Sequence, residues 1–243
     1  MNGTRGARLR LMALKQIADV TFPTRWADFR LLAFEGVQAN KKAREVETAL
    51  ALILGNIQST PPVVRIHSQC TTGDVFHSMR CDCHDQLHLA LRMIAAQGAG
   101  VLVYEHQEGR GIGLMEKLRA YQLQDKGLDT LEANLRLGHA VDLRDYALSV
   151  AILRFLKVRS LQLMTNNPDK INAVRSSGIE IARRLSADVP GNPQSAHYVV
   201  TKRDKLGHLY GSATDSHMVG TYFDHSTPTM EGITPQLAPL PPH

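Results

Sequence analysis

Helix-like and strand-like segments alternate between residues 85 and 185, and this alternation restricts the chain to layered architectures. Apolar residues recur at helical spacing from Gln86 to Ala96, and a run typical of a buried strand follows at Val101–Tyr104. Further helices are expected from about Gly113 to Gln124 and from Leu143 to Leu156. The sequence therefore predicts an α/β fold.

The flanking segments contain weaker signals. A polar loop is expected at Gly36–Glu47, and Pro168 is suited to the first turn of another helix. Strands are expected at Val20–Phe22, Phe29–Phe34, Val63–His67 and Ser160–Met164. The inner face of the helix at residues 143–156 is expected to comprise Tyr146, Val150, Leu153 and Phe155 or Leu156.

The two ends of the chain differ in composition from its middle. Residues 1–17 form a basic leader that is expected to be helical or frayed, and residues 211–243 have the composition of a disordered tail. Residues 18–210 are expected to form one domain, since 243 residues with 43% hydrophobic content can bury one large core.

Composition excludes several classes of protein. The apolar stretch Thr48–Leu54 is far shorter than the roughly 20 residues of a membrane-spanning helix, and no signal peptide is recognisable. A cytoplasmic location without membrane contact is therefore expected. The net charge of +5 favours an anionic partner, but 6 Phe, 6 Tyr and 1 Trp form no aromatic-basic stripe. These features favour a small phosphorylated ligand over a nucleic acid.

All three cysteines fall within one segment, as Cys70-x10-Cys81-x-Cys83. An odd number leaves one thiol outside any disulfide, and a cytoplasmic chain keeps its thiols reduced, so a metal site is the favoured interpretation. Three thiolates leave the fourth position of a zinc ion open, which is typical of catalytic zinc. Zinc in such a site lowers the pKa of water to about 7.

Two other interpretations of the cysteines stay open. The thiols could be inert and partly buried, or His67, His77 or His84 could complete a closed structural zinc site. The zinc-dependent nucleobase deaminases are excluded, because their His-x-Glu and Pro-Cys-x-x-Cys elements are absent.

A glycine-rich segment, Glu105–Gly113, joins a predicted strand to a predicted helix. Glycines let the backbone approach a ligand, and a helix start offers N–H groups to an anion. The segment matches neither a P-loop nor a dinucleotide fingerprint, so a plain strand-to-helix turn is an equal alternative. Arg65, Arg110 and Arg144 are candidates for binding phosphate, although each could equally be a surface charge.

In this order the segments resemble the GTP cyclohydrolase II family across roughly residues 18–210. The resemblance implies that family's fold, a mixed sheet flanked by helices. The segments that carry it are Arg65–Asp74, Ser78–Cys83 with Gln86-Leu87, Gln107–Leu114, Lys117–Asp125, Asp129–Asn134, Leu137-Gly138, Asp142–Arg144 and Leu163–Lys170.

The resemblance also implies an activity, the first step of riboflavin biosynthesis. GTP and water would give 2,5-diamino-6-ribosylamino-4(3H)-pyrimidinone 5′-phosphate, formate and pyrophosphate. Zinc would be held by Cys70, Cys81 and Cys83 and would activate water for opening the imidazole ring. Magnesium and a homodimer are further expectations.

Roles for individual residues follow from the same resemblance. Tyr121 matches the family's catalytic tyrosine, a phenol able to relay a proton. Asp142 and Arg144 match a base and a nucleophile toward the α-phosphorus, although a pKa above about 12 suits Arg144 equally to clamping phosphate. Glu108 could accept from two guanine donors. The other matches to GTP contacts are Arg65, Ile66, His67, Ser68, Gln69, Gln86, Gly109, Arg110, Thr130, Thr165 and Lys170.

The chain departs from the family pattern beside the cysteines. Gln69 stands where the family usually has Glu, and His84-Asp85 replace a glycine and an uncharged residue. A lost carboxylate changes metal or water placement, and His84 adds a competing ligand or acid–base group. The alternatives are a paralogue that releases a formylated product or uses a related base or nucleotide, and a non-catalytic protein that binds zinc and nucleotide.

Overall fold

The computed structural model describes residues 11–38, 46–140, 142–190 and 193–211. The first ten residues of the expected leader, the middle of the expected loop at 36–47 and nearly all of the expected tail lie outside these residues. None of the helices in the described ranges is long and apolar enough to cross a membrane.

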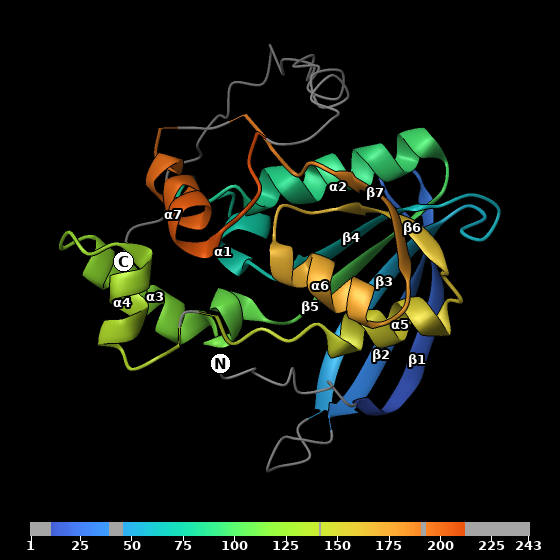
Figure 1. Cartoon of the computed structure of the whole chain (residues 1–243), viewed down its shortest axis with the longest axis horizontal. Coiled ribbons are helices and arrows are strands. Elements are labelled where there is room, and N and C mark those ends of the chain that lie inside the picture. The colour runs from blue at the N-terminus through green and yellow to red at the C-terminus, as the bar shows by residue number, and fades with distance from the viewer. Residues whose placement is uncertain (1–10, 39–45, 141, 191–192, 212–243) are drawn as a thin grey trace, which may run out of the picture.

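The described residues build a seven-stranded mixed sheet with the order β1-β2-β3-β5-β4-β6-β7 (Figure 1). The pairs β1–β2, β2–β3 and β3–β5 are antiparallel, whereas β5–β4, β4–β6 and β6–β7 are parallel. The strands are β1 (Leu11–Pro23), β2 (Asp28–Gln38), β3 (Val46–Leu54), β4 (Val63–Ser68), β5 (Gly100–Glu105), β6 (Ser160–Met164) and β7 (Glu180–Leu185).

Helices cover both faces of the sheet, which confirms the predicted α/β fold. On one face α2 packs over the buried side chain of Leu102, and on the other α5 and α6 pack over Val101 and Val103. This alternation along β5 follows from the two-residue period of a strand. The helices are α1 (Thr71–Asp74), α2 (Cys83–Gln97), α3 (Leu114–Gln124), α4 (Thr130–Arg136), α5 (Ala147–Phe155), α6 (Pro168–Ser176) and α7 (Ala196–Leu206), with a 3-10 turn η1 (Glu108–Gly111).

The parallel half of the sheet determines where polar groups gather. Strands β4, β5 and β6 run in the same direction, so the segments that follow Ser68, Glu105 and Met164 leave the sheet at one edge. Helices α3, α4 and α7 extend from this edge, to the left of the sheet in Figure 1. The cysteine and glycine segments therefore lie near one another.

Several boundaries differ from the sequence expectations. Residues 11–17, expected in the leader, begin β1, whose backbone pairs with β2 although most of its side chains are exposed. The helix expected from Leu143 begins at Ala147, because the preceding loop holds polar contacts, and Phe155 is 48% exposed. Of the predicted inner face, Tyr146 and Leu153 are buried and Leu156 packs against the core, while Leu148 and Ile152 are buried beside them.

The predicted strands at 20–22, 29–34, 63–67, 101–104 and 160–164 and the helices at 86–96 and 113–124 are confirmed within longer or slightly shifted elements. Pro168 opens α6, where the Asn167 side chain caps the helix by accepting from the Asp169 N–H. The structure also contains β3, β7, α4 and α7, which no pattern in the sequence predicted.

Candidate active site

The three cysteines come together beside the start of α2. Cys70 follows β4, Cys81 precedes α2 and Cys83 is its first residue. Their Sγ atoms lie within 4.8 Å of one another, and those of Cys70 and Cys81 are 3.7 Å apart. Tetrahedral zinc with bonds of about 2.3 Å places two sulfurs roughly 3.8 Å apart. The cluster therefore fits the zinc ion that the cysteine spacing predicts.

A glycine allows this close approach. A Cβ added at Gly73 in α1 would lie 2.9 Å from the Cys81 sulfur and 3.1 Å from the Cys70 sulfur. No histidine joins the three thiols within the described residues. His67 Nε2 instead lies 3.2 Å from Asp74 Oδ1, and the rings of His77 and His84 contact each other. These contacts disfavour a closed zinc site with a histidine ligand.

A buried ammonium group lies against the cluster. Lys117 of α3 donates to the Cys70 sulfur at 3.0 Å, to Glu108 Oε1 at 2.8 Å and to the Thr72 hydroxyl at 2.9 Å. Hydrogen bonds from Cys81 and Cys83 hold the pKa of Cys70 far below its usual range. Burial is the largest single influence and opposes the charge of Lys117, but Cys70, Tyr121 and Glu108 together outweigh it and raise the pKa of the ammonium. The site thus pairs a thiolate with a fixed cation.

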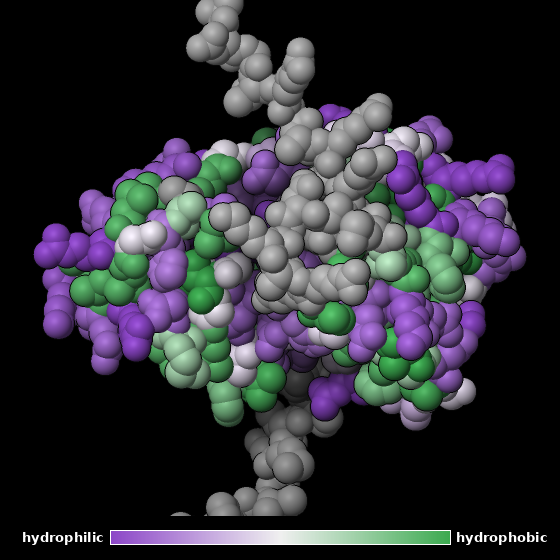
Figure 2. Space-filling view, turned by 90° about the horizontal axis from the view of Figure 1, so that it is seen from below, coloured by the Kyte–Doolittle hydropathy of each residue, from purple (hydrophilic) through white to green (hydrophobic). Residues whose placement is uncertain are grey.

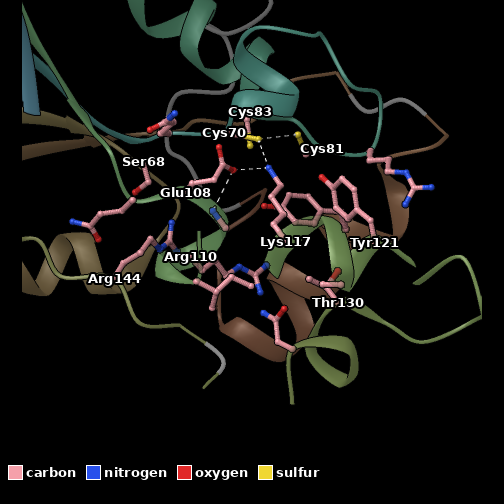
Figure 3. Close-up of a pocket in the computed structure, with 18 of the residues that line it drawn as sticks. Ser68, Cys70, Cys81, Cys83, Glu108, Arg110, Lys117, Tyr121, Thr130 and Arg144 are labelled. Atoms are coloured by element: carbon pink, nitrogen blue, oxygen red, sulfur yellow. Dashed lines mark hydrogen bonds and ion pairs between the residues drawn. The ribbon is translucent and has the colours of Figure 1, made fainter. Parts of the chain in front are cut away.

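The cysteines form one wall of a cavity. Figure 3 shows Glu108, Lys117 and Tyr121 gathered around the sulfurs, with Arg110, Arg144 and Thr130 farther along the wall. The lining residues that the sequence predicted are Ser68, Gln69, Cys70, Cys81, Cys83, Glu108, Gly109, Arg110, Tyr121, Thr130 and Arg144.

A second cavity shares part of this wall. Its lining contains no Asp or Glu, whereas five cationic side chains contribute to it, namely Arg65, Arg110, Arg144, Lys170 and Lys202. The two cavities share Ser68, Cys83, Arg110, Arg144 and Tyr198. A molecule with an anionic group could therefore extend from the cysteines into the cationic cavity.

Arg110 is the clearest candidate for binding an anionic group of a ligand. It has φ of 61°, a left-handed backbone conformation that side chains adopt at a cost, and Gly109 before it has φ of 60°. Both terminal nitrogens of its guanidinium are buried without a hydrogen-bond partner in the protein. Buried donors are normally satisfied, so these two point to an acceptor supplied by a ligand.

Arg144 is held in a fixed orientation by Asp142. Its Nε donates to Asp142 Oδ1 at 2.9 Å and its Nη2 to Oδ2 at 2.5 Å. Burial alone would lower the pKa of Arg144, but Tyr146 and Asp142 raise it overall. Gln107 anchors the same loop by accepting from the Asp145 N–H and donating to its carbonyl. Arg144 is therefore a permanent cation in a rigid loop.

Tyr121 lies on the same face of α3 as Lys117, four residues away. Its hydroxyl is 3.4 Å from the Thr72 hydroxyl, and burial raises the pKa of the phenol. The phenol therefore stays protonated at neutral pH and can donate a hydrogen bond into the cysteine cavity.

Glu108 lines the cavity, but its carboxylate already has partners. Oε2 accepts from the Thr71 N–H at 2.6 Å, and Oε1 accepts from Lys117 and from the Gly109 N–H. Each carboxylate oxygen has about two acceptor positions. Oε2 thus keeps room for one further donor, whereas Oε1 is fully used.

The predicted residues of the cationic cavity are Arg65, His67, Ser68, Gln86, Arg110, Arg144, Thr165 and Lys170. Two predicted residues line neither cavity. The Ile66 side chain is buried in the core, where its carbonyl accepts from Lys170, and Asp142 acts on the site through Arg144.

Sequence reasoning missed several lining residues. Lys117 stands in a segment that carries the family resemblance, and its spacing of four residues from Tyr121 is a signal that could have placed both side chains on one helix face. Tyr198, Lys202 and His208 come from α7 and the residues after it, where no sequence pattern predicted a helix.

Comparison with known proteins tests the family resemblance. The family model for GTP cyclohydrolase II matches residues 15–186, which is more than half of the chain. The chain belongs to the GTP cyclohydrolase II family. The resemblance predicted from the motifs is thus confirmed, and the protein is an enzyme of a riboflavin-biosynthesis family.

Three curated relatives illustrate the similarity. The GTP cyclohydrolase-2 proteins of Buchnera aphidicola and Proteus mirabilis are each 46% identical over 199 residues, which cover 82% of this chain and 98% and 97% of theirs. The riboflavin biosynthesis protein RibBA of Chlorobium phaeovibrioides is 45% identical over 208 residues, 85% of this chain and 49% of its own. This chain thus spans about half the length of the RibBA relative and nearly all of the other two.

A solved structure also overlaps with the fold. RibBX of A. baumannii, a two-domain 3,4-dihydroxy-2-butanone 4-phosphate synthase, matches 72% of this chain and 40% of its own at 17% identity and a TM-score of 0.38. This similarity is too low to add to the assignment.

Proposed function

We propose that this chain hydrolyses GTP to 2,5-diamino-6-ribosylamino-4(3H)-pyrimidinone 5′-phosphate, formate and pyrophosphate. The observation that carries the proposal is that two cavities share Arg110 and Arg144 in their lining. One is the cysteine cavity, and the other is the cationic cavity, whose lining contains no Asp or Glu. One end suits a metal that acts on the base, and the other suits the triphosphate. The names of the relatives, GTP cyclohydrolase-2, agree with this arrangement.

Cys70, Cys81 and Cys83 would hold the zinc ion, because three soft thiolates with a fourth position free match its coordination. When bound there, zinc supplies Lewis-acid chemistry and lowers the pKa of water to about 7. Lys117 offsets part of the negative charge of the cluster through Cys70. Tyr121 would donate its proton toward the opening imidazole ring.

The cationic cavity would bind the phosphates. Arg110 offers two buried nitrogens without a partner in the protein, and the buried Arg65 guanidinium adds positive charge. Burial and the neighbouring Arg65 and Arg144 lower the pKa of Lys170, and a bound phosphate would favour its charged form. Arg144 would clamp the α-phosphate rather than attack it, since a guanidinium with a raised pKa has no lone pair for nucleophilic attack. Asp142 orients that guanidinium.

Glu108 would contribute to guanine recognition through Oε2, which has room for one donor from the base. Oε1 serves another purpose, since it anchors the Lys117 ammonium. This division replaces the two-donor contact that the sequence suggested.

Other expectations remain proposals. We place the catalytic domain at residues 18–210, extended to residue 11 by the start of β1, in the cytoplasm. A homodimer agrees with the apolar side chains on α3 and α4, where Met115, Leu118 and Leu135 are 63%, 40% and 56% exposed. Hydrophobic groups gather at this end of the molecule in Figure 2. Among the described residues, no group of three or more carboxylates or histidines gathers in a way that could hold magnesium. A magnesium ion would therefore have to bind together with the phosphates of the substrate.

A product assay tests the proposal. The zinc-loaded protein is incubated with GTP and magnesium, and formate, pyrophosphate and the pyrimidine are quantified by mass spectrometry. Equal amounts of formate and pyrophosphate are expected. A ring-opened product that retains the formyl group would instead establish the paralogue, and unchanged GTP would establish a binding protein.

A further inference from the structure

Helix α7 lies beyond residues 15–186, the part of the chain that matches the family model. Figure 1 shows it beside α1 and above α3 and α4, at the edge of the sheet where the site lies. Few apolar contacts hold it there, since Val200 is 44% exposed while Thr201 and Lys202 are 7% exposed. Polar side chains therefore bring α7 to the site.

The strongest of these contacts reaches the turn that carries two cysteines. Lys202 forms an ion pair of 2.5 Å with Asp82, and both side chains are buried. Asp82 lies between Cys81 and Cys83 in the sequence. It also accepts hydrogen bonds from Gln86 at 2.8 Å and from the Tyr210 hydroxyl at 3.3 Å. Lys202 is therefore the cation that neutralises a buried carboxylate on the cysteine turn.

A second side chain of α7 stands between the two cavities. Tyr198 lines both of them. The Lys202 ammonium lies 4.2 Å from its ring centroid and the Arg110 guanidinium 5.7 Å, distances that allow cation–π attraction. The tyrosine ring thus supports the arginine whose terminal nitrogens have no partner in the protein.

Further contacts fix the end of the helix and the residues after it. Lys205 pairs with Asp129, the residue that caps α4. The Leu209 N–H donates to the Asn166 carbonyl at 2.9 Å, and the Gly211 N–H donates to Asp188 at 3.0 Å. Residues 205–211 are thereby attached to the start of α4 and to the segments that follow β6 and β7.

We propose that α7 is part of the active site. Lys202 is a positioning residue that holds Asp82, and with it the turn bearing Cys81 and Cys83, in the geometry that retains zinc. Tyr198 forms the shared wall of the two cavities and holds Arg110 toward the bound phosphate. The inference rests on the proposed function in one respect, because it takes the cysteines as the zinc ligands and the cationic cavity as the phosphate site.

The first test measures how fast a chromogenic chelator removes zinc from the purified, zinc-loaded protein. Lys202→Met should release zinc about 10- to 100-fold faster than the wild type, the effect usual for groups that orient metal ligands. Lys202→Arg keeps the charge and should restore most of the retention. The matched control is Arg203→Met, since Arg203 is exposed and pairs with Asp204 of the same helix. Equal release from Lys202→Met and Arg203→Met would overturn the role of Lys202.

The second test leaves the ion pair intact and therefore does not depend on the folding of the Lys202 variants. Binding of inorganic pyrophosphate is measured by calorimetry on the zinc-loaded protein. Tyr198→Phe keeps the ring and should bind within about twofold of the wild type, whereas Tyr198→Leu should bind about tenfold more weakly. Equal affinity in all three proteins would overturn the role of Tyr198. Neither test uses GTP turnover, so absence of formate would refute the proposed function alone.

Discussion

The contact between Lys117 and Glu108 gives a prediction whose size follows from the structure. The ammonium and the carboxylate are 2.8 Å apart, with 12% and 8% of their side chains exposed. Replacing Lys117 by Met keeps the aliphatic stem but removes the charge. Glu108 would then retain only the N–H groups of Thr71 and Gly109, and Cys70 would lose its cationic donor.

The expected cost follows from these contacts. Breaking one partner of a buried ion pair costs about 3–5 kcal/mol. Because Glu108 keeps two N–H donors, Lys117→Met should lower the free energy of unfolding by about 3 kcal/mol, the lower end of this range. For a chain of this length, that corresponds to a fall in Tm of roughly 6–12 °C. Glu108→Gln should cost a similar amount, because Lys117 would then lie buried without its carboxylate.

A double-mutant cycle measures the pair itself. Urea unfolding at fixed zinc concentration is compared for the wild type, both single variants and the double variant, with Lys126→Met as a control at an exposed site. The double variant should be more stable than the sum of the single effects predicts, by about 2 kcal/mol. Additivity within about 0.5 kcal/mol would refute the pairing of Lys117 with Glu108.

Three further predictions concern catalysis, pH and metal. Arg144→Ala should lower kcat/KM for pyrophosphate release from GTP by at least about 100-fold, because a charge-assisted contact is lost and Asp142 is left unpaired; an unchanged rate would contradict the clamp. Burial raises the pKa of Glu105 from 4.5 to about 7, so the folded state binds this proton more tightly than the unfolded state. The stability that the protonated Glu105 contributes is therefore complete below pH 4.5 and is lost as the pH rises through 7. Glu105→Gln should remove about 3 kcal/mol of that pH dependence in unfolding measurements between pH 5 and 8, whereas Glu180→Gln, at an exposed position, should leave it unchanged. Cys81→Ser should reduce zinc from about one per chain to near zero by elemental analysis, and full occupancy would exclude this cysteine as a ligand.

The fold could be predicted where burial imposes a regular pattern. The segments that became α2 and β5 lie in the core, so their apolar residues follow the period of a helix and the run of a buried strand. The first part of strand β1, residues 11–17, escaped prediction because β1 lies at the edge of the sheet with mostly exposed side chains. Helix α7 escaped because ion pairs rather than an apolar face attach it to the fold.

The site was predictable where chemistry depends on local spacing. Three cysteines within 14 residues indicated a metal, and the structure places their sulfurs together. Contacts between distant segments had no local signal, as with Lys202 and Asp82, which are 120 residues apart. The partners of Glu108 were hidden for the same reason, since Thr71 and Lys117 lie in separate elements.

The central claim is that one nucleotide is processed at both ends of the joined cavities. C8 of guanine carries no oxygen, so both oxygens of the released formate must come from water. Hydrolysis of GTP in ¹⁸O-water should therefore give doubly labelled formate, one ¹⁸O in the 5′-phosphate of the pyrimidine product and unlabelled pyrophosphate. Labelled pyrophosphate would contradict hydrolysis at the α-phosphorus, and an unopened guanine ring would contradict the role assigned to the cysteine cavity.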